Sequence, residues 1–138
     1  MLDKLAIFLS LFLFSCSINS VSSKQIIPAE LYCDTTIGQF IKSNKNFIDI
    51  KNKNFQKILT KINPSFKNKK YNLIIVSDAK PSAGYSLEFK NVIKKNNVYH
   101  LNFNDVKPSK NFIGSFAVTY TYCLLKIDNL EKFKVNIK

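Results

Sequence analysis

The sequence contains no arginine: all 21 basic residues are lysines, set against 9 acidic residues, and the formal net charge is +12. Bidentate recognition of phosphate and guanine depends on the planar guanidinium group, which lysine lacks. The lysines are dispersed along the chain, and the abundant Asn, Ile, Phe and Lys residues share A/T-rich codons. The charge therefore favours a solvated surface, with attraction to an acidic partner or lipid headgroups as the alternative. We expect no nucleic-acid partner.

Glycine and histidine are also scarce. Three glycines cannot build a glycine-rich phosphate cradle, and no GxSxG, P-loop or HExxH motif occurs. His100 is the only histidine, and its alternation with Asn102 and Asn104 places it on the polar side of a strand. The acidic residues are scattered without the spacing of metal ligands. We therefore predict a protein without catalytic residues, metal or cofactor. A small hydrolase or ligand carrier is the less favoured alternative.

The first residues are typical of an export signal. An apolar run at 5–14 would form a helix of about 15 Å, too short for a bilayer core of about 30 Å. The following Leu13-Phe14-Ser15-Cys16 resembles the bacterial lipobox, with Phe14 as a departure from its usual small residue. We predict a signal peptide at 1–15 and a lipidated Cys16 opening a polar tether at 16–24. Cleavage at 21–23 and an uncleaved leader are the alternatives.

The predicted location follows from this motif. Ser17 stands where an Asp is associated with retention at the inner membrane in some bacteria. We therefore expect an outer-membrane lipoprotein of the bacterial cell envelope, which faces the periplasm or the cell surface.

Two cysteines remain after the leader, Cys33 and Cys123. An even pair in an exported chain favours a disulfide, because the periplasm and cell surface are oxidising. Closing so long a loop would stabilise the fold by roughly 4–5 kcal/mol in the chain-entropy model. Two buried thiols that act as small apolar residues are the alternative.

Residues 25–138 are expected to form one domain of the α+β class. Thr35 and Thr36 could cap a first helix carrying Ile37, Phe40 and Ile41. Helical spacing of apolar residues predicts a second helix over 52–62, which Pro64 ends. From residue 71 the period becomes that of strands. We predict one or two short N-terminal helices, then an antiparallel β-sheet or small β-sandwich of about five strands, at 72–77, 85–89, 99–103, 115–127 and 133–137.

The β half, 71–138, contains a family resemblance. The stretch 79–89 (AKPSAGYSLEF) resembles the K-P-[ST]-G-G-Y motif of the protease-complex subunit PrcB C-terminal domain family. A hairpin, the Lys107-Pro108 loop and the strand at 119–122 (TYTY) follow in the family's order, so that the resemblance covers 74–135. Ala83 replaces the family's first Gly and Thr121 its frequent Pro. The chain is also loosely similar to protease inhibitors of the chagasin type, which present a comparable loop.

The resemblance implies a lipoprotein partner domain that associates with an exported protein, such as a serine protease. We therefore predict a lipid-anchored binding module, in the role of a protease-associated subunit or regulator. The loops 78–84 and 105–114 could contact the partner, together with exposed tyrosines of the long strand. A structural envelope lipoprotein without a dedicated partner is the alternative, in which case the first loop is only a hairpin turn. The predicted partner-binding residues are Lys80, Pro81, Ser82, Ala83, Gly84 and Tyr85.

Overall fold

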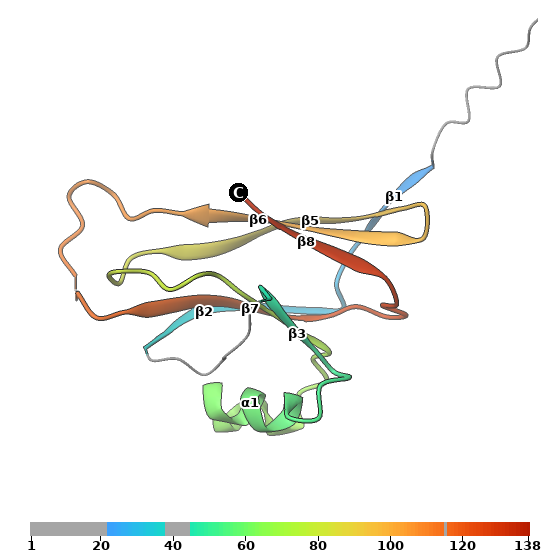
Figure 1. Cartoon of the computed structure of the whole chain (residues 1–138), viewed down its shortest axis with the longest axis horizontal. Coiled ribbons are helices and arrows are strands. Elements are labelled where there is room, and N and C mark those ends of the chain that lie inside the picture. Colours follow the sequence, from blue (N-terminus) through green and yellow to red (C-terminus); the bar gives the residue numbers. More distant parts are fainter. Residues whose placement is uncertain (1–21, 38–44, 115) are drawn as a thin grey trace, which may run out of the picture.

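A computed structural model describes residues 22–37, 45–114 and 116–138. The predicted signal peptide, Cys16 and most of the tether lie outside the described residues. The described chain is mostly β, with two four-stranded sheets and one short α-helix (Figure 1). No helix in this part of the chain is long and apolar enough to cross a membrane. The elements are β1 (Ser23–Ile26), β2 (Glu30–Ile37), β3 (Phe47–Asp49), α1 (Phe55–Ile62), the 3-10 helix η1 (Pro64–Asn68), β4 (Leu73–Val76), β5 (Ser86–Lys95), β6 (Val98–Val106), β7 (Thr119–Lys126) and β8 (Phe133–Ile137).

The strands form two sheets that face each other like a sandwich. The first sheet has the order β1-β5-β6-β8 and the second the order β2-β7-β4-β3. All pairs are antiparallel except β6 and β8, which run parallel. The prediction of an antiparallel sandwich therefore holds for its main part. The strand count of about five was too low, because β1, β2 and β3 precede α1 in a part of the chain where helices were expected.

The second sheet is buried on both faces. One face packs against the first sheet through a cluster that includes Leu73, Ile75 and Leu125. The other packs against α1 and η1 through Ile74 and Val76, among others. Both faces of β4 are therefore apolar, which explains the uninterrupted run at 73–76.

The helix predicted over 52–62 corresponds to α1, which begins at Phe55 and ends at Ile62 as predicted. Phe55 and Leu59 are one turn apart and buried, while Lys57 and Lys61 are exposed on the opposite side. However, α1 lies in the middle of the chain after three strands, so the N-terminal placement of the helical part was wrong. Thr35 and Thr36, predicted to cap an earlier helix, belong to β2. Phe40 and Ile41 lie outside the described residues.

The hairpin between β5 and β6 has the predicted polar turn. Asn96 and Asn97 both adopt positive φ, at 51° and 60°. This conformation matches the right-handed twist of a two-residue hairpin, and asparagine tolerates it better than most residues. In contrast, the long strand β7 begins at Thr119 and not near residue 115, so residues 116–118 belong to a loop.

Candidate functional site

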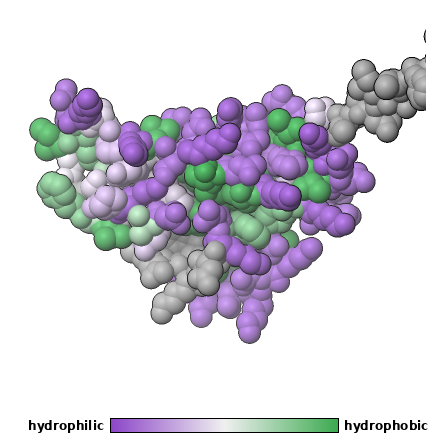
Figure 2. All heavy atoms as spheres, turned by 45° about the horizontal axis from the view of Figure 1, so that its top comes forward, coloured by the Kyte–Doolittle hydropathy of each residue, from purple (hydrophilic) through white to green (hydrophobic). Residues whose placement is uncertain are grey.

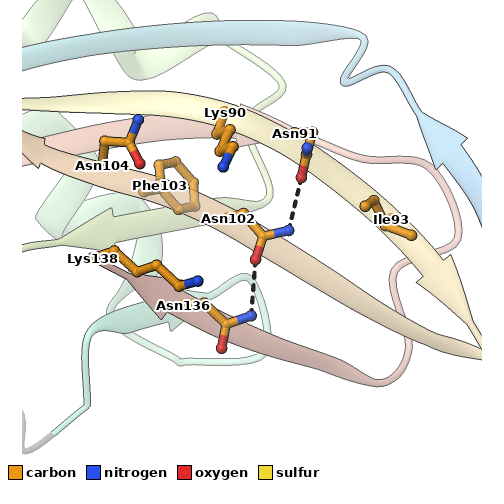
Figure 3. A pocket seen from close by; sticks show the side chains of 8 residues that line it. All are labelled: Lys90, Asn91, Ile93, Asn102, Phe103, Asn104, Asn136 and Lys138. Carbon is orange, nitrogen blue, oxygen red and sulfur yellow. Dashed lines mark hydrogen bonds between the residues drawn. The ribbon is translucent and has the colours of Figure 1, made fainter.

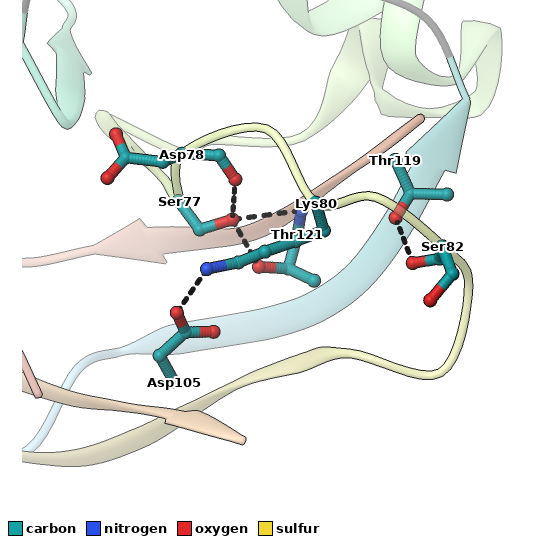
Figure 4. Close-up of polar contacts among 7 residues, drawn as sticks. All are labelled: Ser77, Asp78, Lys80, Ser82, Asp105, Thr119 and Thr121. Carbon is teal, nitrogen blue, oxygen red and sulfur yellow. Dashed lines mark hydrogen bonds and ion pairs between the residues drawn. The ribbon is translucent and has the colours of Figure 1, made fainter. Parts of the chain in front are cut away.

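The loops 78–84 and 107–114 lie together at one end of the sandwich, and 116–118 lead from there into β7 (Figure 1). The first loop is fastened where it leaves β4. The Thr121 hydroxyl donates to Ser77 Oγ over 2.6 Å, and the Ser77 hydroxyl donates to the Asp78 carbonyl over 3.0 Å (Figure 4). The Thr121 amide also donates to Ser77 Oγ, over 3.3 Å. Thr121, where the resembled motif often has a proline, thus uses its N–H to hold this loop.

Lys80 fastens the middle of the first loop. Its backbone exchanges two hydrogen bonds with Thr119, of 2.8 and 3.0 Å. Its ammonium forms an ion pair with Asp105 at the end of β6 (Figure 4). The same ammonium lies 5.5 Å from the ring centroid of Tyr85. The side chains of Lys80 and Asp105 are only 13% and 25% exposed. Lys80, one of the predicted partner-binding residues, thus pairs its charge within the chain and holds the loop to the sheet.

Glycines allow the two loops to pack closely. Gly84 has a φ of +94°, and a Cβ built there would lie 2.7 Å from the ring of Phe112. A Cβ at Gly114 would lie 2.1 Å from the same ring. Ala83, where the resembled motif has a glycine, is not among the described residues with positive φ. The substitution therefore carries no backbone strain, because the left-handed position is that of Gly84.

Beyond this contact, the second loop exposes apolar side chains. Ile113 is 98% exposed and Phe116 92%, with Val118 at 52% and Phe112 at 42%. We call these four residues the apolar tip. Figure 2 shows apolar side chains at the left end of the molecule, where this loop projects. Isolated exposed apolar residues are ordinary, but four within 112–118 concentrate exposed apolar surface in one place, as is typical of an interaction site.

The six predicted partner-binding residues differ in their accessibility. Pro81 and Gly84 are exposed, whereas Ser82, Ala83 and Tyr85 are half-buried. The Ser82 carbonyl accepts a hydrogen bond of 2.9 Å from the Thr119 hydroxyl. The most exposed large apolar side chains at this end of the molecule, Ile113 and Phe116, are therefore outside the predicted set. The sequence does carry a signal for this exposed part of the loop. Apolar residues recur at 112–118 around Gly114, where a glycine favours a loop over a buried strand.

The tyrosines of β7 are less accessible than predicted. Tyr122 is buried beneath α1 and η1, and Tyr120 is half-buried against the same cluster. Burial raises the pKa of Tyr122 far above its usual value, and the negative charge of Asp34 raises it further. Tyr122 is therefore a core residue, and we remove it from the candidate site.

Cys33 and Cys123 form a disulfide between directly opposed positions of β2 and β7. The predicted pairing is confirmed, and the alternative of two separate thiols is wrong. Cys33 is exposed and Cys123 is fully buried. The bond ties the edge strand β2 to the middle of its sheet, behind the candidate site.

The candidate site is far from the point at which the tether enters the domain. β1 starts at Ser23, which pairs with Lys95 beside the β5–β6 turn. This turn and the start of β1 lie at the right of Figure 1, while the two loops lie at the left. Among the described residues, no three His, Cys, Asp or Glu side chains gather as metal ligands would.

Comparison with protein-family models, curated proteins and solved structures finds no significant match to the chain. The resemblance to the PrcB C-terminal domain family therefore stays a prediction.

Proposed function

We propose that the protein is a lipid-anchored binding module of the bacterial cell envelope, which docks on an exported protein through the apolar tip and the adjoining loop 78–84. The supporting observation is that Ile113 and Phe116 are almost fully exposed on a loop that is packed against its neighbour through Phe112 and Gly84. Apolar residues held at the end of a rigid β scaffold are the kind of anchor that protein interfaces bury. The expected role is that of a protease-associated subunit or regulator.

The position of the tether supports a protein target over the anchoring membrane. If Cys16 carries the lipid, the chain enters the domain at the end remote from the loops. The apolar tip would then point away from the bilayer to which the protein is attached. Burying one large apolar side chain is worth about 1.5–3 kcal/mol. The loss of either Ile113 or Phe116 from an interface should therefore weaken binding at least about tenfold.

This proposal can be tested on the full-length, membrane-anchored protein in its native envelope. Chemical crosslinking and affinity capture are followed by mass spectrometry, for the wild type and for Ile113→Asp and Phe116→Asp. The matched control is Ile27→Asp, because Ile27 is 85% exposed and lies just before β2, whose first residue pairs with Lys126 at the end of β7 opposite the loops. We expect one dominant exported protein, such as a serine protease, to be lost from both tip variants and retained by the control.

The opposite result favours the structural alternative. If the wild type captures only abundant porins and lipid, unchanged by the tip variants, no dedicated partner exists at this end. All four proteins should be anchored and folded to the same extent, because the substituted side chains contribute nothing to the core.

A further inference from the structure

A second feature lies on the outer face of the first sheet, away from the loops. Asn91, Asn102 and Asn136 occupy opposed positions on β5, β6 and β8. Asn102 Nδ2 donates to Asn91 Oδ1 over 2.7 Å, and Asn136 Nδ2 donates to Asn102 Oδ1 over 2.9 Å (Figure 3). The three amides thus form one continuous row across three strands, which we call the asparagine row. Since neighbouring strands are spaced by about 4.8 Å, the row spans roughly 10 Å.

The asparagine row holds hydrogen-bonding groups that face outward. An amide group has two donor hydrogens and two acceptor lone pairs, and each bond within the row uses only one of each. In the described chain, the NH2 of Asn91 donates to no protein acceptor and the carbonyl of Asn136 accepts from no protein donor. The bonds within the row fix the orientation of each amide before any ligand arrives. A ligand would therefore meet oriented donors and acceptors at little entropic cost.

Two lysines flank the asparagine row. A depression of about 220 Å³ lies along it, and its lining includes Lys90 and Lys138. Figure 3 shows both ammonium groups on the side of the row that faces Phe103 and Asn104, one near each end of the row. Neither lysine forms a salt bridge with a described residue. A β-bulge between Phe89 and Asn91 shifts the register at Lys90, and bulges of this kind re-aim side chains beside binding sites.

The charge of the whole face is positive. Lys134 and His100 lie in the adjacent row, where the register pairs them across β6 and β8. Glu88 is the acidic residue on this part of β5, opposite Asn104 at the far end of the depression. An acid group would therefore be attracted to the row from above, between Lys90 and Lys138.

We propose that the asparagine row is a binding site for an acidic polysaccharide. The sugar hydroxyls, which both donate and accept hydrogen bonds, would pair with the row's amides, and a carboxylate would lie between the two lysine ammonium groups. The length of the row is comparable with that of a disaccharide unit. The site requires no guanidinium group, because a lysine ammonium acts as a point charge and can hold a carboxylate through single N–H···O contacts. This site is independent of the apolar tip, and its failure would leave the proposed docking function untouched.

The test uses the purified protein and oligogalacturonate as the acidic probe, with maltohexaose as the neutral one. NMR spectra of the ¹⁵N-labelled protein follow the side-chain amides of the asparagine row at low salt. We expect oligogalacturonate to shift these three amide signals, and the double variant Lys90→Met/Lys138→Met to bind about tenfold or more weakly. The matched control is Lys134→Met, on the same face but outside the depression, and it should change affinity less than about twofold.

Two further results decide the proposal. Asn102→Ala should abolish the amide shifts at Asn91 and Asn136, while the remaining backbone signals show that the fold is intact. Equal weakening by Lys134→Met and by the flanking lysine variant would instead show general charge attraction and overturn the site. Binding of maltohexaose as tight as that of oligogalacturonate would overturn its assignment to an acidic ligand.

Discussion

Loss of the disulfide should destabilise the protein more than any other single change considered above. The bonded cysteines are separated by 90 residues in the sequence. In the chain-entropy model, a loop of this length stabilises the fold by about 4.6 kcal/mol at 25 °C, because it restricts the unfolded chain. Cys33→Ser is the best variant, since Cys33 is exposed and its replacement leaves no cavity. Cys123 remains in the core as a small apolar side chain.

The assay is urea unfolding of the purified protein, followed by circular dichroism. We expect Cys33→Ser to reduce the free energy of unfolding by about 3–5 kcal/mol. A reducing agent should lower the wild type to the same value and leave the variant unchanged, which separates the bond from the side chain. A loss below about 1 kcal/mol, or a variant that still responds to the reducing agent, would refute the reasoning.

Two other predictions concern the candidate site and the core. Gly84→Ala should reduce the free energy of unfolding by about 1–2 kcal/mol, because an alanine is strained at a φ of +94° and its Cβ meets Phe112. Ala83→Ser is the control in the same urea assay, and an equal loss of stability in both variants would contradict this account. Tyr122 has a raised pKa in the folded state and about 10 when unfolded, so its contribution to stability is complete below pH 10 and is lost as the pH rises above it. Tyr122→Phe should flatten the alkaline fall in the free energy of unfolding, and an unchanged alkaline limb would show that another group causes it.

The elements with a clear period could be predicted from the sequence. The spacing of Phe55, Leu59 and Ile62 indicated α1, and alternation indicated β5, β6 and β8. The second half of β2 was mistaken for the start of a helix because Thr35 and Thr36 are also good helix caps, and only the eight-residue pairing of β2 with β7 decides between the two structures. Such long-range pairing leaves no local signal in the sequence. The start of β7 was placed too early for the same reason, since the alternation at 116–118 has no partner strand.

The candidate sites were predictable to different degrees. The turn residues at 81–84 indicated a loop, and the structure adds that Gly84 and Phe112 join this loop to the next one. The asparagine row was not predictable, because asparagine is common throughout the chain. Alternation placed Asn102 on a polar face, but its partners depend on a bulge in β5 and on the parallel pairing of β8. Sequence periodicity indicates neither of these features.

The most direct test of the proposed docking function is photo-crosslinking from a single position. A photoreactive residue replaces Ile113 in the full-length protein in its native envelope, and Ile27 carries the same residue in the control. We predict that position 113 yields one dominant adduct with an exported protein and that position 27 does not. No protein adduct at position 113, or the same adducts from both positions, would contradict the proposed docking function.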